Sequence, residues 1–307
     1  MGQDQQRDQL EEKLEQKLAK LENAQYCLIN NSGVSALQMM FQLLGHKARI
    51  VVQDDFYSGT RHMLNKVFNE RLEQVAINPN NFKEKLVELL SHQFTLKLQA
   101  ILQCKYLTLE RSPRFKPLDL GCDIVIDSCT KYICGHSDCL AGSICTNNLE
   151  IYQRLKEIRD YSFNLYLMEQ GLQTFKLRGS VIQQNALKLA NYLEQHPKVE
   201  KVLHPLLVSH PNYSVMKGQT TGYMGTFSFY LKCLCEFVKN QKRFEFGTSL
   251  GGVKSSIDHF GGTMRYYYTI EQRIERGYTD NFYRVSTGIE DVEDLIKDLE
   301  QALEKLE

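Results

Sequence analysis

The sequence predicts an α/β fold, because short apolar runs typical of covered strands alternate with amphipathic helices along most of the chain. Three observations carry this prediction. Leucines recur at three- and four-residue intervals between residues 8 and 23, which indicates an amphipathic helix. The β-branched run RIVVQ at 49–53 is typical of a covered parallel strand. The alternating segment GTFSFYLK at 225–232 predicts a half-buried strand in the last third of the chain.

The first half of the chain contains a second helix and two further strands. The helix is expected directly after Ser32-Gly33, in the segment VSALQMMFQLLG, and its apolar residues on nearly every side predict that it is buried. The runs CDIVIDS, from Cys122, and LAGSICT are strand-like. We therefore expect two strands to bracket Lys131.

The last part of the chain indicates a smaller domain. A long helical region is expected from 149 to 196, with a bend near Arg178-Gly179 that we interpret as a domain boundary. A terminal amphipathic helix, DVEDLIKDLEQALEKLE, closes the sequence. We predict a large α/β domain with a mainly parallel sheet at 1–178 and a small C-terminal α+β domain at 179–307.

Composition and charge favour a small-molecule partner. The 37 lysines and arginines balance 37 aspartates and glutamates, so the chain has no basic field for a nucleic acid or an anionic membrane. No apolar run is long enough to cross a bilayer, and the first residues are polar rather than a signal peptide. Nine cysteines, an odd number without a CxxC pair, do not resemble a secreted disulfide framework. We expect a cytoplasmic protein that binds neither membranes nor nucleic acids.

Five of the cysteines lie between 122 and 145 together with His136, which makes a metal site one alternative. Their spacings match no zinc module. Small cysteine side chains are also common in buried strands. The sequence therefore predicts no metal site.

Lys131 is the candidate nucleophile of the sequence. It lies in the expected loop between two apolar strands, with Ser128, Thr130 and His136 close by in sequence. A partly desolvated amine loses its proton more easily and becomes nucleophilic. The alternative is an ordinary solvated surface lysine.

The sequence around Lys131 resembles that of a known enzyme family. PLDLGCDIVIDSCTKYICGHSDCLAG at 117–142 is similar to the pattern PLDLGADIVxHSxTKYxxGHSDxxxG. That pattern belongs to the pyridoxal-phosphate (PLP) enzymes of cysteine and methionine metabolism, which include cystathionine γ-lyase, β-lyase and γ-synthase and methionine γ-lyase. The resemblance implies the PLP-dependent transferase fold of type I, with PLP bound covalently to Lys131. It also implies that Lys131 shuttles protons and that the Ser128 and Thr130 hydroxyls hold the phosphate.

A second segment of the same family pattern concerns the phosphate group. LENAQYCLINNSGVSAL at 21–37 is similar to LExxxxALxxSSGMAA, and the resemblance implies that the backbone amides of Gly33 and Val34 bind the phosphate. A helix that begins just after Gly33 presents N–H groups and a positive dipole end to an anion. Without the family context, Ser32-Gly33 is an ordinary helix N-cap.

Three more segments resemble the family in the same order. VVQDDFYSGT is similar to VVxxDxYGGT, which implies that Tyr57 stacks on the pyridine ring and takes part in proton transfer. TSLGGVKSSIDH and YRVSTGIEDVEDLIKDLEQAL are similar to SLGGxxSLxxHP and IRLSVGIEDxEDLIxDLxQAL. They imply that Arg284 clamps the substrate carboxylate with its guanidinium fork, assisted by Ser249. Without the family resemblance, Tyr57 would be interpreted as a half-buried packing residue and Arg284 as a charged surface residue.

Two parts of the family pattern are missing. Family members carry an N-terminal arm with a Tyr-Ser-Arg element that contacts the phosphate in the neighbouring subunit, and this chain begins just after it. They also carry an aspartate that keeps the pyridine nitrogen protonated, and Tyr106 stands at the aligned position. Glu110 is a nearby carboxylate that could replace this aspartate if the loop is rebuilt. Asp127 does not replace it, because its side chain is expected on the opposite face of the strand from Ser128.

The resemblance implies a trans-sulfuration enzyme. Its members act on cystathionine, homocysteine, cysteine or methionine as carbon–sulfur lyases or γ-synthases, and they assemble as dimers and tetramers, so a homo-oligomer is implied. The missing aspartate and arm favour the alternative of a catalytically impaired relative, which keeps the fold and acts as a PLP binder or subunit partner. The sequence leaves open whether chemistry occurs at Cβ or Cγ.

Overall fold

The computed structural model divides the chain into two compact units. It describes residues 2–44, 46–53, 56–77, 116–159, 164–220, 222–233 and 237–306. Unit 1 takes the described residues up to 77 together with 116–130 and 138–169, and unit 2 takes 131–137 and 170–306. The predicted boundary after residue 178 stays a prediction.

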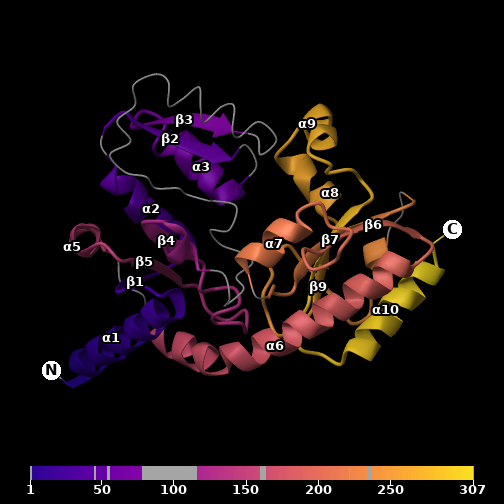
Figure 1. The fold of residues 1–307 in the computed structure, drawn as a ribbon, viewed down its shortest axis with the longest axis horizontal. Coiled ribbons are helices and arrows are strands. Elements are labelled where there is room, and N and C mark those ends of the chain that lie inside the picture. Colours follow the sequence, from indigo (N-terminus) through magenta and orange to yellow (C-terminus); the bar gives the residue numbers. More distant parts are fainter. Residues whose placement is uncertain are drawn as a thin grey trace. The chain divides into compact units, whose positions relative to one another are not determined.

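Unit 1 consists of short strands with helices packed around them, and Figure 1 labels these elements. The helix predicted at the N-terminus is confirmed, because Leu14 and Leu18 of its apolar stripe are fully buried. The helix predicted after Ser32-Gly33 is confirmed as well. The elements of unit 1 are α1 (Gly2–Glu22), β1 (Tyr26–Asn30), α2 (Gly33–Leu43), β2 (Ala48–Gln53), α3 (Ser58–Lys66), β3 (Leu72–Ile77), η3 (Pro117–Leu120), β4 (Ile124–Asp127), β5 (Gly142–Thr146) and α5 (Leu149–Glu157).

The strands of unit 1 form two sheets of different direction. β2 and β3 pair in parallel, as predicted for the RIVVQ run. In the second sheet, of order β1-β5-β4, both pairings are antiparallel. The described pairings of unit 1 are therefore mixed, and the antiparallel ones depart from the mainly parallel sheet that we predicted. The physical reason is the short connection at 128–141, which contains no crossover helix and so returns the chain antiparallel.

The apolar core of unit 1 joins both sheets to the helices. Side chains of α2, α3 and α5 pack against β2, β4 and β5. α2 contributes most of its length to this core, as its apolar sequence predicted. The members with the least exposed surface are Leu28, Ala36, Leu37, Phe41, Leu64, Ile144 and Leu155.

Unit 2 is built on one mixed sheet with the strand order β6-β7-β10-β9-β8. The strand predicted at 225–232 is confirmed as β7, which pairs antiparallel with β6 and β10. α6 (Leu165–Gln195) begins in unit 1 and continues into unit 2 from residue 170. The other elements of unit 2 are β6 (Val199–Leu203), α7 (Tyr213–Gln219), β7 (Thr226–Leu231), η4 (Phe237–Asn240), β8 (Glu245–Phe246), β9 (Ser256–Asp258), α8 (Phe260–Thr263), η5 (Met264–Tyr266), α9 (Ile270–Glu275), β10 (Phe282–Ser286) and α10 (Val292–Glu304).

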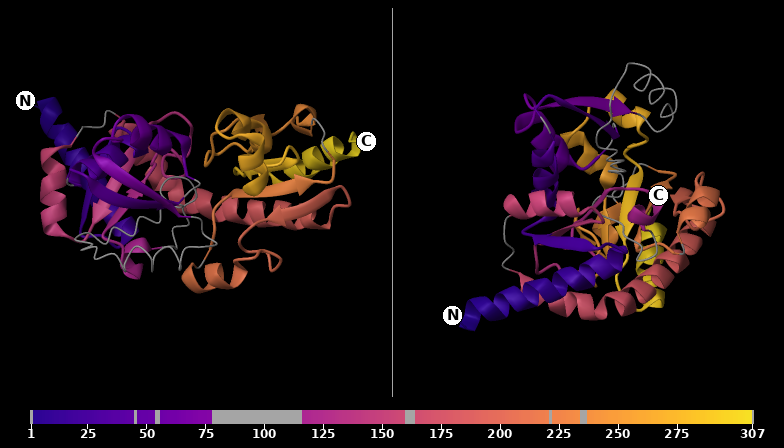
Figure 2. Two further views of the ribbon diagram at one scale, coloured as in Figure 1. Left: turned by 90° about the horizontal axis from the view of Figure 1, so that it is seen from above. Right: turned by 60° about the vertical axis from the view of Figure 1, so that its left-hand side comes forward.

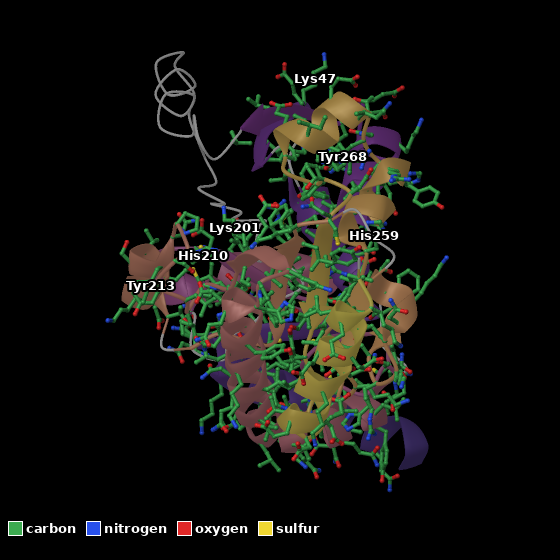
Figure 3. All side chains as sticks on the ribbon, turned by 90° about the vertical axis from the view of Figure 1, so that its right-hand side faces the viewer. Lys47, Lys201, His210, Tyr213, His259 and Tyr268 are labelled. Carbon is green, nitrogen blue, oxygen red and sulfur yellow. The ribbon has the colours of Figure 1, made fainter. Side chains whose placement is uncertain are left out.

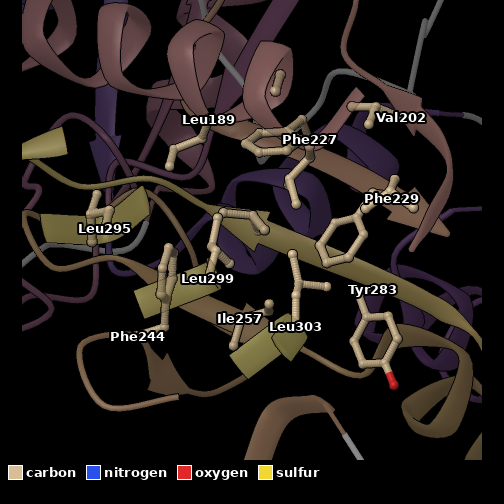
Figure 4. Close-up of a cluster of buried hydrophobic side chains, with 14 of the residues drawn as sticks. Leu189, Val202, Phe227, Phe229, Phe244, Ile257, Tyr283, Leu295, Leu299 and Leu303 are labelled. Carbon is tan, nitrogen blue, oxygen red and sulfur yellow. The ribbon is translucent and has the colours of Figure 1, made fainter. Parts of the chain in front are cut away.

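The core of unit 2 lies between its sheet and two helices. The later turns of α6 and the whole of α10 run side by side in Figures 1 and 2. Leucines of both helices interdigitate with aromatic side chains of β7 and β10 in Figure 4. The labelled residues are Leu189, Val202, Phe227, Phe229, Phe244, Ile257, Tyr283, Leu295, Leu299 and Leu303.

The long helical region expected at 149–196 is two helices. α5 ends at Glu157 and α6 begins at Leu165. α6 then runs through Arg178 and Gly179 without a break, and the bend predicted at that point stays a prediction. Gly179 is tolerated because a helix anchored by many buried residues absorbs the cost of one glycine.

Candidate functional site

Lys131 opens a tight turn at 131–137 in unit 2. The Gly135 amide donates to the Lys131 carbonyl at 2.8 Å, and Gly135 adopts a positive φ of 75°. The Lys131 amine donates to Ser249 Oγ at 3.3 Å. Burial, and then repulsion from Arg284, lower the pKa of Lys131. A lower pKa increases the fraction of neutral, nucleophilic amine near neutral pH.

Arg178 of α6 holds the backbone of this turn. Its side chain is 4% exposed. Its guanidinium donates to the carbonyls of Tyr132 at 2.8 Å and Ile133 at 3.0 Å, and to the Gly171 carbonyl at 2.7 Å. Gly135 must be a glycine, since an added Cβ would lie 2.0 Å from the Arg178 guanidinium. These hydrogen bonds of Arg178 thus anchor the turn at 131–137, called the lysine turn below, to α6.

The segment SLGG at 249–252 packs directly on the lysine turn. An added Cβ on Gly251 would lie 2.9 Å from the Tyr132 nitrogen, and Gly251 has a φ of 80°. Its amide donates to Ser286 Oγ at 2.9 Å. The conformation allowed to glycine therefore brings Ser249 to the Lys131 amine.

Arg284 lies on β10 of the same unit. Its Nη2 donates to the Thr248 carbonyl at 2.6 Å and lies 3.5 Å from Asp258 Oδ2. Its Cζ lies 4.8 Å from the centroid of the Phe260 ring, a cation–π distance. Three predicted residues, Lys131, Ser249 and Arg284, are thus brought together in unit 2.

A second group of predicted residues lies in unit 1 at the start of α2. Ser32 caps the helix, because its Oγ accepts from the Ser35 amide at 3.1 Å and the Ser35 hydroxyl accepts from the Ser32 amide at 3.0 Å. The amides of Gly33 and Val34 have no hydrogen-bond partner among the described residues. Two N–H groups of a capped helix N-terminus are available to an anion.

Close backbone packing brings Ser128 to this helix start. A Cβ on Gly33 would lie 3.1 Å from Ser128 Cα and Cβ. A Cβ on Gly142 of β5 would lie only 2.3 Å from the Ser32 carbonyl oxygen. Gly142 therefore needs glycine, because a second backbone passes at contact distance, whereas an added Cβ at Gly33 would require Ser128 to move slightly.

Thr130 and Tyr57 are placed differently from Ser128. The Thr130 hydroxyl accepts from the Ala141 amide at 3.0 Å and donates to the Ala141 carbonyl at 3.2 Å, so it closes the loop between β4 and β5. Tyr57 precedes α3 and is 48% exposed. It makes no hydrogen bond with the other predicted site residues in the described parts of the chain.

Other predictions meet the structure as follows. Tyr106 and Glu110 lie outside the described residues. Asp127 ends β4 and is buried. In the described ranges, no group of three or more His, Cys, Asp or Glu residues is arranged to hold a metal ion. The same ranges contain no helix with the length and apolar character needed to span a membrane.

Comparison with known proteins decides the family. The family described as Cys/Met metabolism PLP-dependent enzyme matches residues 6–101 and 108–304, which is most of the chain. The chain belongs to this family. Its cofactor is therefore PLP, and the family's type I fold accounts for the helices and mixed sheets of the two units.

Individual members of the Cys/Met metabolism family are similar along nearly the whole chain. Cystathionine γ-lyase of Dictyostelium discoideum is 36% identical over 95% of this chain and 84% of its own length. Cystathionine γ-lyase of Bacillus subtilis is 32% identical over 95% of this chain and 86% of its own length. Cystathionine β-lyase of Coxiella burnetii is 33% identical over 93% of this chain and 83% of its own length.

The described residues of this family member fit PLP. A phosphate is commonly bound by N–H groups at a helix start, and the amides of Gly33 and Val34 beside Ser128 would suit it. An amine that is to condense with the aldehyde reacts in its neutral form, and the lowered pKa of Lys131 fits that requirement.

Sequence reasoning missed two residues of unit 2. Arg178 was read only as a bend in a helix, although it anchors the lysine turn. Asp258 was not considered, although it pairs with Arg284 across β9 and β10. The signal for both is a charged residue within an otherwise buried segment, which needs a partner to be stable there.

Proposed function

We propose that the protein is a PLP-dependent carbon–sulfur lyase that acts on a sulfur amino acid, as cystathionine γ-lyase does. One observation carries the proposal: the Lys131 amine has a lowered pKa and lies beside Ser249 and Arg284 in a chain of the Cys/Met metabolism family. Relatives named cystathionine γ-lyase and β-lyase support the choice of substrate class.

Each predicted site residue receives a role in this proposal. Gly33 and Val34 bind the phosphate through their amides, and Ser128 adds its hydroxyl. The Thr130 hydroxyl is already hydrogen-bonded to the Ala141 backbone. It can bind the phosphate only if it gives up a hydrogen bond to Ala141. Tyr57 stacks on the ring and assists proton transfer.

The remaining roles concern the substrate. Arg284 binds the α-carboxylate through its guanidinium fork, assisted by the Ser249 hydroxyl. Lys131 holds the cofactor covalently and then moves protons at the substrate carbons in its neutral form. When bound, PLP supplies an electron-accepting ring. Arg284 and Ser249 fix the position of the substrate's carboxylate, and Lys131 fixes the site of proton transfer. Together they orient the substrate's carbon–sulfur bond.

The proposal extends to organisation and location. We expect domains at 1–178 and 179–307, a homo-oligomer (dimer or tetramer) and a cytoplasmic location, all of which follow from the sequence and the family resemblance. Light scattering of the purified protein tests the oligomer.

Activity of the purified protein tests the proposed function. We expect a visible absorption band of lysine-bound PLP, and release of cysteine and an oxo acid from L-cystathionine. Lys131→Ala should abolish both, whereas Lys176→Ala, at an exposed position of α6, should change neither. A band without turnover would favour the impaired relative instead. Absence of any band in the wild-type protein contradicts the assignment.

A further inference from the structure

Asp258 is a buried carboxylate directly beside Arg284. The two residues face each other in the antiparallel register of β9 and β10. Asp258 is 1% exposed, and its Oδ2 lies 3.5 Å from Arg284 Nη2. A carboxylate with so little access to water is stable only with partners that compensate its charge.

The Asp258 carboxylate is itself held in place. Its Oδ1 accepts a hydrogen bond from Thr263 Oγ1 at 2.8 Å, at the end of α8. The next residue, His259, labelled in Figure 3, stacks on Tyr283 at 5.0 Å and contacts the Asp280 carbonyl at 2.6 Å through Nε2. Asp258 therefore has one oxygen committed to Thr263 and the other directed at Arg284.

Arg284 is restrained from three sides as a result. The Thr248 carbonyl and Asp258 both bind Nη2, and the Phe260 ring lies against the guanidinium. A planar guanidinium with one nitrogen fixed and one face covered retains few orientations. The orientation in which the Arg284 guanidinium is held decides how a substrate carboxylate can pair with its N–H groups.

We propose that Asp258 is a positioning residue, which holds the Arg284 guanidinium in the orientation that binds the substrate's α-carboxylate. This inference rests on the role proposed for Arg284. It assigns Asp258 no contact with the substrate, since Asp258 acts through Arg284.

Kinetics with L-cystathionine test the positioning role. Asp258→Ala should raise KM roughly 10- to 100-fold, the effect of losing a hydrogen bond to a charged group, with little change in kcat. Asp258→Asn keeps an accepting oxygen and should restore most of the affinity. In an Arg284→Ala background, Asp258→Ala should have no further effect on KM, because no guanidinium is left to orient.

Asp298 provides a matched control. It is also buried in unit 2, at 4% exposure, but its carboxylate accepts from the backbone amides of Lys242, Arg243 and Phe244. Asp298→Ala should lower stability without changing KM. An equal rise in KM in both alanine variants would show that Asp258 acts only through folding and would overturn the inference.

A nuclear magnetic resonance measurement needs no turnover. In the wild-type protein the Arg284 Nη groups should give separate ¹⁵N resonances, which merge in Asp258→Ala as the guanidinium rotates freely. Separate resonances in the variant would overturn the inference, and so would merged resonances with an unchanged KM. A wild-type protein without PLP binding or turnover overturns the proposed function instead, and the resonances still decide whether Asp258 holds Arg284.

Discussion

The two clusters of predicted site residues are built from different kinds of contact. In unit 1, Gly33 and Gly142 allow backbones to pass at contact distance, and helix amides are left available to an anion. In unit 2, buried charged side chains, Arg178 and Asp258, hold the elements around Lys131. The first cluster depends on the absence of side-chain volume and the second on charged hydrogen bonds.

This difference matches what each cluster has to do in the proposed function. A phosphate is bound by fixed N–H groups, which need only correct backbone positions. A lysine that exchanges protons needs a controlled pKa, which depends on burial and on neighbouring charges. The two clusters should therefore fail for different reasons when they are mutated.

The largest effect is expected from Arg178→Met in unit 2. The substitution keeps apolar volume but leaves the Tyr132 and Ile133 carbonyls without their charged donor. Each unsatisfied buried acceptor costs about 1–3 kcal/mol, so unit 2 should lose about 3–5 kcal/mol of unfolding free energy. Urea unfolding measures this loss. Lys176→Met, exposed on the same helix, is the control, and a similar loss there would remove the special role of Arg178.

The two units should also respond to pH in opposite directions. In unit 2, burial lowers the pKa of His204 to about 4 from 6.5, so the stability due to its neutral form is present above pH 6.5 and is lost as the pH falls to 4. The loss should reach about 3 kcal/mol, because each unit between the two pKa values corresponds to about 1.4 kcal/mol. Amide hydrogen exchange in β7, corrected for the pH dependence of the intrinsic exchange rate, measures this loss of stability. His204→Phe should remove the pH dependence.

In unit 1, burial raises the pKa of Glu15 to about 7 from 4.5, although Arg159 lies 2.9 Å from its carboxylate. The stability due to its protonated form is present below pH 4.5 and is lost as the pH rises through 7. Exchange in β1 should therefore accelerate over this range, and Glu15→Gln should flatten the profile. Equal pH profiles in both units would contradict the distinction.

Added volume should selectively damage the cluster in unit 1, which is formed by Gly33, Ser128 and Gly142. Gly142→Ala places a methyl group 2.3 Å from the Ser32 carbonyl oxygen, so the strand or the helix start must shift, at about 1–3 kcal/mol. Gly33→Ala meets Ser128 at 3.1 Å and should cost less stability. Both should weaken PLP binding, measured by titration of the apo protein. Gly218→Ala, in open space on α7, should stabilise slightly. A normal PLP affinity in Gly142→Ala would contradict the prediction.

The smallest effect is expected on the pKa of Lys131. Repulsion from Arg284 is the second cause of its lowered pKa, after burial. Arg284→Met should therefore raise the pH midpoint of covalent PLP capture by Lys131, because more of the amine stays protonated. The visible band followed across pH measures the midpoint. Arg243→Met, exposed in the same unit, should leave the midpoint unchanged, and a midpoint that falls in Arg284→Met would exclude the electrostatic explanation.

Several elements were predictable because their cause is local. The leucine spacing of α1, the apolar α2 after Ser32-Gly33 and the alternation in β7 each depend on residues close in sequence. Lys131 between two strands was predictable for the same reason. The strand direction in the β1-β5-β4 sheet was not, because pairing depends on which distant strands meet.

By itself, the sequence determined the family, through motifs around Lys131 and Arg284 that keep their residue types and order. Only the tertiary structure decided which charged residues support them. Arg178 reaches the lysine turn from α6, and Asp258 reaches Arg284 across a strand pair. Such partners are chosen by distance in space and by the cost of burying a charge, and neither quantity is local in the chain.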